Sequence, residues 1–251
     1  MLNDDIKLYR KDSMNYLKRM TNDFNIHPSL LITTDSDPVN DSYLKGIISD
    51  CTFLDFPYRI LDVNDPFLVE SNFYGIINIS SQYRFISPAQ DIEGKISGLF
   101  DNACAKGIID YLKYNNFRID GKNVTIVGRG KNMGKPLTTA FLKENANVTV
   151  LHSHTSEIDM GKHLSISDII ITATNVPNQF NLKSDFFNES QIIIDTGTCF
   201  DDSGKLCGNI IKYIDYPNFI ASPGGGGLLT RLALIKNLIQ TCIIRGDEKH
   251  E

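Results

Sequence analysis

Apolar and polar positions alternate with two different periods along the first part of the chain. A helical period predicts an amphipathic helix over residues 4–25, carried by Ile6, Tyr9, Met14, Leu17, Met20 and Phe24. Short apolar runs predict strands at residues 30–34, 56–61 and 75–79, with a turn at 35–38 and a helix starting at Asp41 or Ser42. A helical segment is expected between the second and third strands. This order is typical of a parallel α/β sheet.

The alternation is more regular in the second half of the chain. A helix is predicted over residues 102–116, then a strand at 124–127, a glycine-containing loop at 128–134 and a helix carrying Leu137, Ala140, Phe141 and Leu142. Strands are predicted at residues 148–151, 169–171 and 192–194. A last apolar helix, about residues 229–244, follows a glycine run at 224–227, and the charged tail 245–251 is expected to fray. This is strand–helix alternation of the doubly wound type.

The composition is that of an ordinary globular protein. The 251 residues are 41% hydrophobic and 22% charged, which allows one large domain or two modest ones. A net charge of −5 gives no sign of a nucleic-acid binder, for which a basic stripe would be expected. The polar, acidic residues 1–5 do not resemble a signal peptide, and no apolar run approaches the ~18–20 residues of a membrane span.

The cysteines and histidines favour neither a disulfide framework nor a metal site. The five cysteines are odd in number and scattered, without a C-x-x-C pair, at positions 51, 104, 199, 207 and 242. The five histidines are also unclustered. Buried thiols in a reducing cytoplasm are therefore expected, with no metal.

The loop at residues 128–134 joins a predicted strand to a predicted helix and carries three spaced glycines. A tight turn needs glycine at Gly128, close approach of the backbone to a pyrophosphate needs it at Gly130, and helix–strand packing favours it at Gly134. The helix N-terminus then offers N–H groups to phosphate. The G-x-G-x-x-x-G spacing is one residue longer than the usual fingerprint, so a plain glycine-rich turn stays an alternative. The expected ligand is a dinucleotide.

The end of the next strand favours NADP over NAD. An NAD site usually has an acid there to bind the ribose 2′-hydroxyl, but this chain has His152-Ser153-His154-Thr155. Arg129, with Ser153 and Thr155, can bind a 2′-phosphate instead. The alternative is that Arg129 is only a solvated surface residue.

These residues carry a resemblance to the bifunctional methylenetetrahydrofolate dehydrogenase/methenyltetrahydrofolate cyclohydrolase family. That family shows V-V-G-R-S-x-x-V-G-x-P and then a C-H-S-x-T-like strand end, which residues 127–136 and 152–155 resemble, with Gly130 in place of serine. Residues 167–174, 194–198 and 204–209 resemble the family's A-D-I-L-V-V-A-V, I-D-V-G-I and G-K-V-V-G-D. Residues 223–230 resemble P-G-G-V-G-P-M-T, and the similarity keeps its order from about residue 102 to 240.

The N-terminal part resembles the family more thinly. Residues 28–30 stand where P-G-L begins the first strand, residues 38–43 keep the spacing of P-A-S-x-x-Y, and residues 91–94 resemble D-V-D-G. The resemblance implies two α/β lobes, the second a Rossmann-type doubly wound parallel sheet, with the final helix returning to the first lobe. The implied folate-side lobe comprises residues 1–115 completed by 229–251, and the NADP-binding domain comprises 116–228.

The resemblance also implies the site residues. The cofactor-binding set is Gly128, Arg129, Gly130, Met133, Gly134, Pro136, His152, Ser153, Thr155, Thr174, Thr196, Gly197 and Thr198. The substrate-facing loop is Pro223, Gly224, Gly225, Gly226, Gly227 and Thr230, with a flexible turn as the alternative. Tyr43 and Glu93 are the catalytic-side candidates; a packing tyrosine and a solvated loop acid are their alternatives.

The departures from the family lie on the folate side. The family lysine, one helical turn after the tyrosine, is Ile47 here, and Lys45 would point to nearly the opposite side unless the register shifts. The family glutamine is Ile79, the pterin acid is Glu93, and P-C-T-P is replaced at residues 102–105.

Hydride transfer to NADP mainly needs positioning, whereas cyclohydrolysis needs proton transfer, to which a general acid/base contributes roughly 10²–10⁴-fold. The expected function is therefore an NADP-dependent 5,10-methylenetetrahydrofolate dehydrogenase with weak or lost cyclohydrolase activity. Two alternatives are an enzyme of the same fold with another substrate and a catalytically silent NADP(H)-binding module. A cytoplasmic homodimer that binds a tetrahydrofolate-type molecule, and neither nucleic acid nor membrane, is the remaining expectation.

Overall fold

The computed structural model describes residues 2–35, 40–65, 72–80, 87–96, 99–174, 186–197, 199–201, 203–210 and 216–247. The chain forms two compact units. Unit 1 comprises Met1–Arg10 and Cys104–Thr230, and unit 2 comprises Lys11–Ala103 and Arg231–Glu251. The domain boundaries after residues 115 and 228 stay a prediction.

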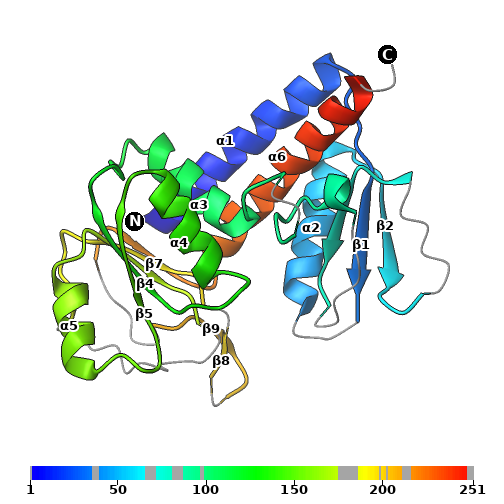
Figure 1. The fold of residues 1–251 in the computed structure, drawn as a ribbon. Helices are drawn as coiled ribbons and strands as arrows, with labels where there is room; N and C mark the ends of the chain where they lie inside the picture. Colours follow the sequence, from blue (N-terminus) through cyan, green and yellow to red (C-terminus); the bar gives the residue numbers. More distant parts are fainter. Residues whose placement is uncertain are drawn as a thin grey trace. The chain divides into compact units, whose positions relative to one another are not determined.

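Unit 2 is built around a three-stranded parallel sheet (Figure 1). Its strands are β1 (Leu30–Thr34), β2 (Tyr58–Asp62) and β3 (Gly75–Asn78), in the order β2-β1-β3. Every residue of β1 and β3 is buried, as their continuous apolar runs predict. The other elements are α2 (Asp41–Leu54), the short helix η3 (Pro88–Gln90) and most of α1 (Leu2–Asp23).

The local turns set the bounds of these elements. Helix α2 ends where Asp55 adopts a left-handed φ of 59° and donates its N–H to the carbonyls of Cys51 and Thr52. The strand expected at 56–61 starts two residues later, because the Pro57 carbonyl accepts from the Leu30 N–H while Pro57 itself has no N–H to donate. The helical segment expected between β2 and β3 falls largely on residues 66–71, outside the described residues.

Unit 1 contains a five-stranded, fully parallel sheet in the order β10-β7-β6-β4-β5. The strands are β4 (Asn123–Val127), β5 (Asn147–Leu151), β6 (Ile169–Thr172), β7 (Ile192–Asp195) and β10 (Phe219–Ile220). Helix α4 (Gly134–Lys143) connects β4 to β5, and α5 (Glu157–Ser165) connects β5 to β6, which lies on the other side of β4. Right-handed crossovers place these helices on opposite faces, so the doubly wound prediction is confirmed.

The core of unit 1 explains why these segments pack as they do. Buried Val127, Leu151, Ile170 and Ile193 from the strands contact Met160 and Leu164 of α5. Helix α5 is capped by Ser156, whose hydroxyl accepts from the Asp159 N–H at 3.1 Å. The remaining elements are α3 (Ala103–Tyr114) and a two-stranded ribbon of β8 (Cys199–Phe200) and β9 (Leu206–Cys207), which the sequence pattern does not predict.

The final helix, α6 (Gly226–Asp247), begins earlier than expected. Gly226 and Gly227 form its first turn, so the prediction of a loop through residue 227 is wrong by two residues. The stretch Gly226–Gly246 is long and apolar enough for a membrane span, but half of it is buried within the protein. Asn237, fully buried, donates to the Ile92 carbonyl, as in a core helix of unit 2.

Candidate functional site

The loop between β4 and α4 has the backbone geometry that its glycines predict. Gly128 has a φ of 123°, and a side-chain carbon there would come within 2.2 Å of the Ala173 carbonyl oxygen. A side-chain carbon at Gly134 would come within 2.3 Å of the Gly128 carbonyl oxygen. One at Gly130 would meet nothing within 4 Å. Packing therefore requires the first and third glycines and leaves the middle one beside open space.

Helix α4 starts directly after this loop. Its N-cap residue, Met133, makes no side-chain capping hydrogen bond, and Pro136 in the first turn has no N–H. The Lys135 N–H donates back to the Gly130 carbonyl at 3.0 Å, which tightens the loop. A helix N-terminus without a side-chain cap is a suitable anion-binding element.

The turn after β5 faces Arg129. Within it, the His152 N–H donates to the Thr155 hydroxyl at 3.0 Å and the Thr155 N–H donates to the His152 carbonyl at 2.8 Å, while Ser153 is exposed. Partial desolvation lowers the pKa of His152, and the positive charge of Arg129 lowers it further. Arg129 is therefore near enough to act electrostatically on this turn, where the missing acid would stand.

Asn209 organises the end of β6, and sequence reasoning did not assign it to the site. Its side-chain amide accepts from the Thr174 N–H and donates to the Thr174 carbonyl, both at 3.0 Å. Asp195, at the end of β7, accepts from the Thr172 hydroxyl and the N–H groups of Gly197, Asn209 and Ile210. Burial raises the pKa of Asp195, and these hydrogen bonds oppose the shift.

The glycine run before α6 lies beside the end of β7. A side-chain carbon at Gly226 would be 3.7 Å from Thr196, and the Ser222 hydroxyl donates to the Gly197 carbonyl. The Thr196 hydroxyl donates to the Thr172 carbonyl, so its role here is structural. Pro223 and Gly224 are exposed, Gly225 is buried, and the Thr230 hydroxyl donates to the Gly226 carbonyl. Thr198 lies outside the described residues.

Together these segments form what we call the carboxyl edge: residues 128–134, 152–155, 173–174, 195–197, 208–210 and 222–226. Gly128 meets Ala173 where β4 and β6 are neighbours, which is where the strand order reverses. Ligands of open α/β sheets bind at the carboxyl ends of the strands at this topological switch point. The described members of the predicted cofactor set therefore share one edge of one sheet, except Pro136, which lies in the first turn of α4.

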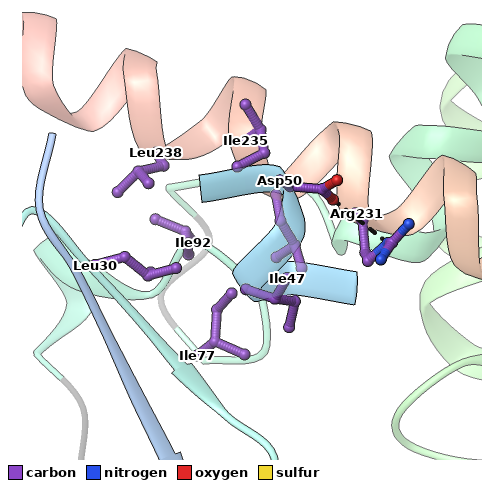
Figure 2. A pocket seen from close by; sticks show the side chains of 9 residues that line it. Leu30, Ile47, Asp50, Ile77, Ile92, Arg231, Ile235 and Leu238 are labelled. Atoms are coloured by element: carbon purple, nitrogen blue, oxygen red, sulfur yellow. Dashed lines mark ion pairs between the residues drawn. The ribbon is translucent and has the colours of Figure 1, made fainter. Parts of the chain in front are cut away.

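The helix α2 in unit 2 carries the position of the family lysine, and an apolar residue fills it. Ile47 is 2% exposed and lines a small cavity with Leu30, Ile77 and Ile92 (Figure 2). Tyr43 is half-buried one turn earlier, and Lys45 is exposed. Because α2 is continuous from Asp41 to Leu54, no shift of register brings Lys45 to the position of Ile47.

A buried ion pair lies at one end of this cavity. The Arg231 Nε lies 3.4 Å from the Asp50 carboxylate, and their side chains are 15% and 6% exposed. Gly46 makes room for it, because a side-chain carbon there would come within 1.5 Å of the Arg231 guanidinium. An arginine stays protonated and cannot act as the missing general base.

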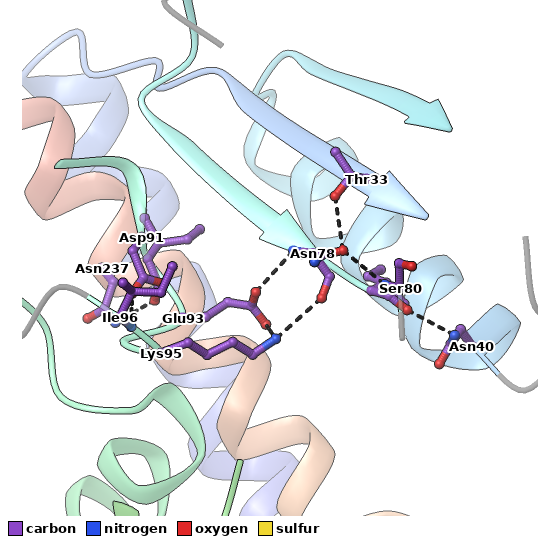
Figure 3. Close-up of polar contacts among 11 residues, drawn as sticks. Thr33, Asn40, Asn78, Ser80, Asp91, Glu93, Lys95, Ile96 and Asn237 are labelled. Atoms are coloured by element: carbon purple, nitrogen blue, oxygen red, sulfur yellow. Dashed lines mark hydrogen bonds and ion pairs between the residues drawn. The ribbon is translucent and has the colours of Figure 1, made fainter. Parts of the chain in front are cut away.

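Glu93 belongs to a polar cluster at the end of β3 (Figure 3). Its carboxylate lies 2.7 Å from the Lys95 ammonium and accepts from the Asn78 N–H at 3.0 Å. Burial raises the pKa of Glu93, and Lys95 opposes that shift. Ile79, at the position of the family glutamine, is 8% exposed and follows Asn78 directly. The alternative of a solvated loop acid is wrong, because Glu93 is buried and paired.

Lys95 and Asn209 are the site residues that sequence reasoning missed. A lysine two residues after an acid is a common surface pattern, so only the fold shows that the two side chains pair. Asn209 could have been found from the sequence, because it is the last residue of the stretch 204–209 that resembles the family's G-K-V-V-G-D. No group of three metal-ligating side chains occurs in the part of the chain that the structure describes.

Comparisons with known proteins agree with this geometry. Residues 102–245 match the family model of the tetrahydrofolate dehydrogenase/cyclohydrolase NAD(P)-binding domain. The bifunctional protein FolD of Clostridium botulinum (strain Okra) is 27% identical, over 94% of this chain and 95% of that protein.

Two solved structures share the fold. The bifunctional dehydrogenase/cyclohydrolase of Thermoplasma acidophilum has a TM-score of 0.78 at 19% identity, covering 94% of this chain and 96% of that one. The Trypanosoma brucei enzyme, complexed with NADP and an inhibitor, has a TM-score of 0.75 at 21% identity, covering 97% and 96%. Because the family model matches more than half of the chain, this protein belongs to the tetrahydrofolate dehydrogenase/cyclohydrolase family.

Proposed function

We propose that this protein is an NADP-dependent 5,10-methylenetetrahydrofolate dehydrogenase whose methenyltetrahydrofolate cyclohydrolase activity is weak or lost. The observation that carries the proposal is the buried Ile47 on a continuous α2, at the position of the family lysine. The carboxyl edge, by contrast, keeps its glycines and its helix N-terminus.

The carboxyl edge fits a dinucleotide, and its charge favours NADP. The loop at 128–134 and the α4 N-terminus would hold the pyrophosphate, and Arg129 with the turn at 152–155 would hold the 2′-phosphate. Thr174, Thr196 and Gly197 would face the remainder of the ligand. When bound, NADP supplies the hydride acceptor. The NADP complex of the Trypanosoma brucei relative supports this choice.

The folate side keeps what hydride transfer needs and lacks what cyclohydrolysis needs. Glu93 and Tyr43 are the groups proposed to bind and orient the folate. Orientation alone accounts for much of the rate of a reaction between two bound partners. Opening a C–N bond by water requires proton transfer, and the side chains of Ile47 and Ile79 have no proton to give or accept.

Spectrophotometry with the purified protein tests the proposal. We expect NADP reduction with methylenetetrahydrofolate, slower reduction of NAD, and methenyltetrahydrofolate hydrolysis at the rate of the buffer alone. Fast hydrolysis would contradict the loss of cyclohydrolase activity. NADP binding without reduction would favour the alternative of a silent or repurposed NADP(H)-binding relative.

A cytoplasmic homodimer is the assembly we propose. The supporting argument is the resemblance alone, since the family commonly forms dimers through the nucleotide domain. Light scattering on the eluted protein tests the oligomeric state, and a monomer at micromolar concentration would contradict it.

A further inference from the structure

The contact between Glu93 and Lys95 gives the folate side a largely buried ion pair. Glu93 is 10% exposed in its side chain, and Lys95 is 28% exposed. The Lys95 ammonium lies 2.7 Å from one carboxylate oxygen of Glu93 and donates to the Asn78 carbonyl at 3.3 Å (Figure 3). Both side chains therefore form hydrogen bonds with the backbone of Asn78: Glu93 accepts from its N–H, and Lys95 donates to its carbonyl.

A buried carboxylate needs a countercharge to stay ionised. The nearby Asp91 carboxylate, which accepts from the Ile96 N–H at 2.6 Å, adds a second negative charge and raises the pKa of Glu93 further. Among the described residues, Lys95 is the only cation whose charge acts on Glu93. Without Lys95, burial and Asp91 would both favour the protonated, neutral acid.

The pair leaves Glu93 with capacity for a ligand. A carboxylate has about four acceptor sites. The Lys95 ammonium occupies one on the first oxygen, and the Asn78 N–H occupies one on the second. Among the described residues, no other donor to the Glu93 carboxylate is found, so one acceptor site on each oxygen is left for two adjacent N–H donors on the edge of a flat ring.

We propose that Lys95 is a positioning residue for the folate, which holds Glu93 ionised and oriented so that both of its oxygens accept from adjacent N–H groups of a pterin ring. This inference rests on the proposed function, because it takes the ligand to be a reduced folate. Lys95 acts through Glu93, and it needs no contact with the reacting carbon.

An opposite role for the same contact predicts an opposite result. If Lys95 merely blocked Glu93 until a ligand displaced it, then removing the ammonium would tighten folate binding. If Lys95 positions Glu93, then removing it weakens binding, and the loss depends on pH. The sign follows from the titration: removing Lys95 raises the pKa of Glu93, so the ionised form is lost as pH falls and recovered as pH rises.

Calorimetric titration with 5-formyltetrahydrofolate, a stable reduced folate, tests the proposal. At pH 6.5 we expect Lys95→Met to bind about 10-fold more weakly than the natural protein, with the deficit shrinking at pH 8.5, since one pKa unit changes the ionised fraction by up to about tenfold. Lys95→Arg keeps the charge and is expected to bind within about twofold of the natural protein. Glu93→Gln removes the titrating group, so its weak binding should not recover at pH 8.5.

Lys113→Met is the matched control, because Lys113 makes a lysine–glutamate pair of the same 2.7 Å length with Glu144 in unit 1. It should bind folate like the natural protein. Tighter binding by Lys95→Met, or an equal loss at both pH values, would overturn the proposal. Thermal unfolding of each variant checks that the fold is kept.

The outcome separates this inference from the proposed function. A natural protein that binds NADP but no 5-formyltetrahydrofolate contradicts the proposed function and this inference with it. Folate binding without NADP reduction contradicts the dehydrogenase alone, and the Lys95 comparison still applies. Folate binding that is indifferent to Lys95→Met contradicts the Lys95 inference alone.

Discussion

The carboxyl edge of unit 1 and the folate side of unit 2 use their residues in different ways. The carboxyl edge depends on backbone shape, because there is no space for a side chain at Gly128 or Gly134. The side-chain amide of Asn209 also forms hydrogen bonds with both the N–H and the carbonyl of Thr174. On the folate side, the two positions that the resemblance assigns to a lysine and a glutamine carry the buried apolar side chains of Ile47 and Ile79. A binding function built on backbone geometry survives many substitutions, whereas acid–base chemistry is lost with one side chain.

Gly128→Ala should give the largest effect. The added carbon meets the Ala173 carbonyl and the φ of 123° is strained for alanine, so we expect a loss of about 4–5 kcal/mol in the free energy of unfolding. Gly130→Ala is its control, since a carbon there meets nothing within 4 Å. Urea denaturation should find Gly130→Ala nearly as stable as the natural protein, while calorimetry finds weaker NADP binding. Equal destabilisation by both would contradict the account of the loop.

Ile47→Lys tests whether the lost lysine can simply be restored. The new ammonium would enter a cavity lined by Leu30, Ile77 and Ile92, where the one carboxylate, that of Asp50, is already paired with Arg231. We expect the free energy of unfolding to fall by about 2–4 kcal/mol, without gain of cyclohydrolase activity. Ile47→Met, of similar volume and uncharged, should cost less than about 1.5 kcal/mol. A stable, hydrolytically active Ile47→Lys would show that the folate side needs only this residue.

Arg129→Met should lower the affinity for NADP by about 10- to 100-fold, the value of one or two charge-assisted hydrogen bonds. Affinity for NAD should change little, because NAD lacks the 2′-phosphate. Lys131→Met, an exposed cation of the same loop, is the control. Calorimetry with both cofactors would decide, and an equal loss for NADP and NAD would contradict the role of Arg129.

Asp168→Asn should have the smallest effect and concerns the other end of the sheet. Lys122 and the Asn123 N–H lower the pKa of Asp168, so its stabilisation is present above the unfolded value of about 3.9 and is lost as pH falls through the folded value. Because the pair is more than a third exposed, we expect a cost below about 1 kcal/mol at pH 7. Denaturation at a series of pH values below 4 should find the difference in the free energy of unfolding shrinking as pH falls, and a constant difference would contradict the prediction.

Sequence patterns predicted what depends on local order. Long apolar runs marked β1, β4, β6 and β7, and glycines marked the loop before α4. The i, i+4 spacing predicted that Tyr43 and residue 47 lie on one face of a helix, and α2 spans both positions. Runs of two residues, such as β8 and β10, are too short to show a period.

Features that depend on tertiary contacts were not predictable. Helix α6 starts at Gly226, inside a run of four glycines, and because glycine is a poor helix former the sequence gives no sign of a helix start there. The four hydrogen bonds to Asp195 come from residues 2 to 23 positions away along the chain. The pairing of Lys95 with Glu93 depends on how the segment after η3 returns to β3.

The division of α6 between the compact units limits how this protein can be taken apart or recombined. The residues of α6 up to Thr230 belong to unit 1, and the rest of this helix belongs to unit 2. In unit 2, Asn237 donates a hydrogen bond to the carbonyl of Ile92, the residue before Glu93. A gene cut after residue 230 would separate Glu93 from that support, and a cut before residue 104 would leave unit 1 without its first ten residues. Neither unit is one uninterrupted segment, so no single cut of the chain separates the cofactor side from the folate side.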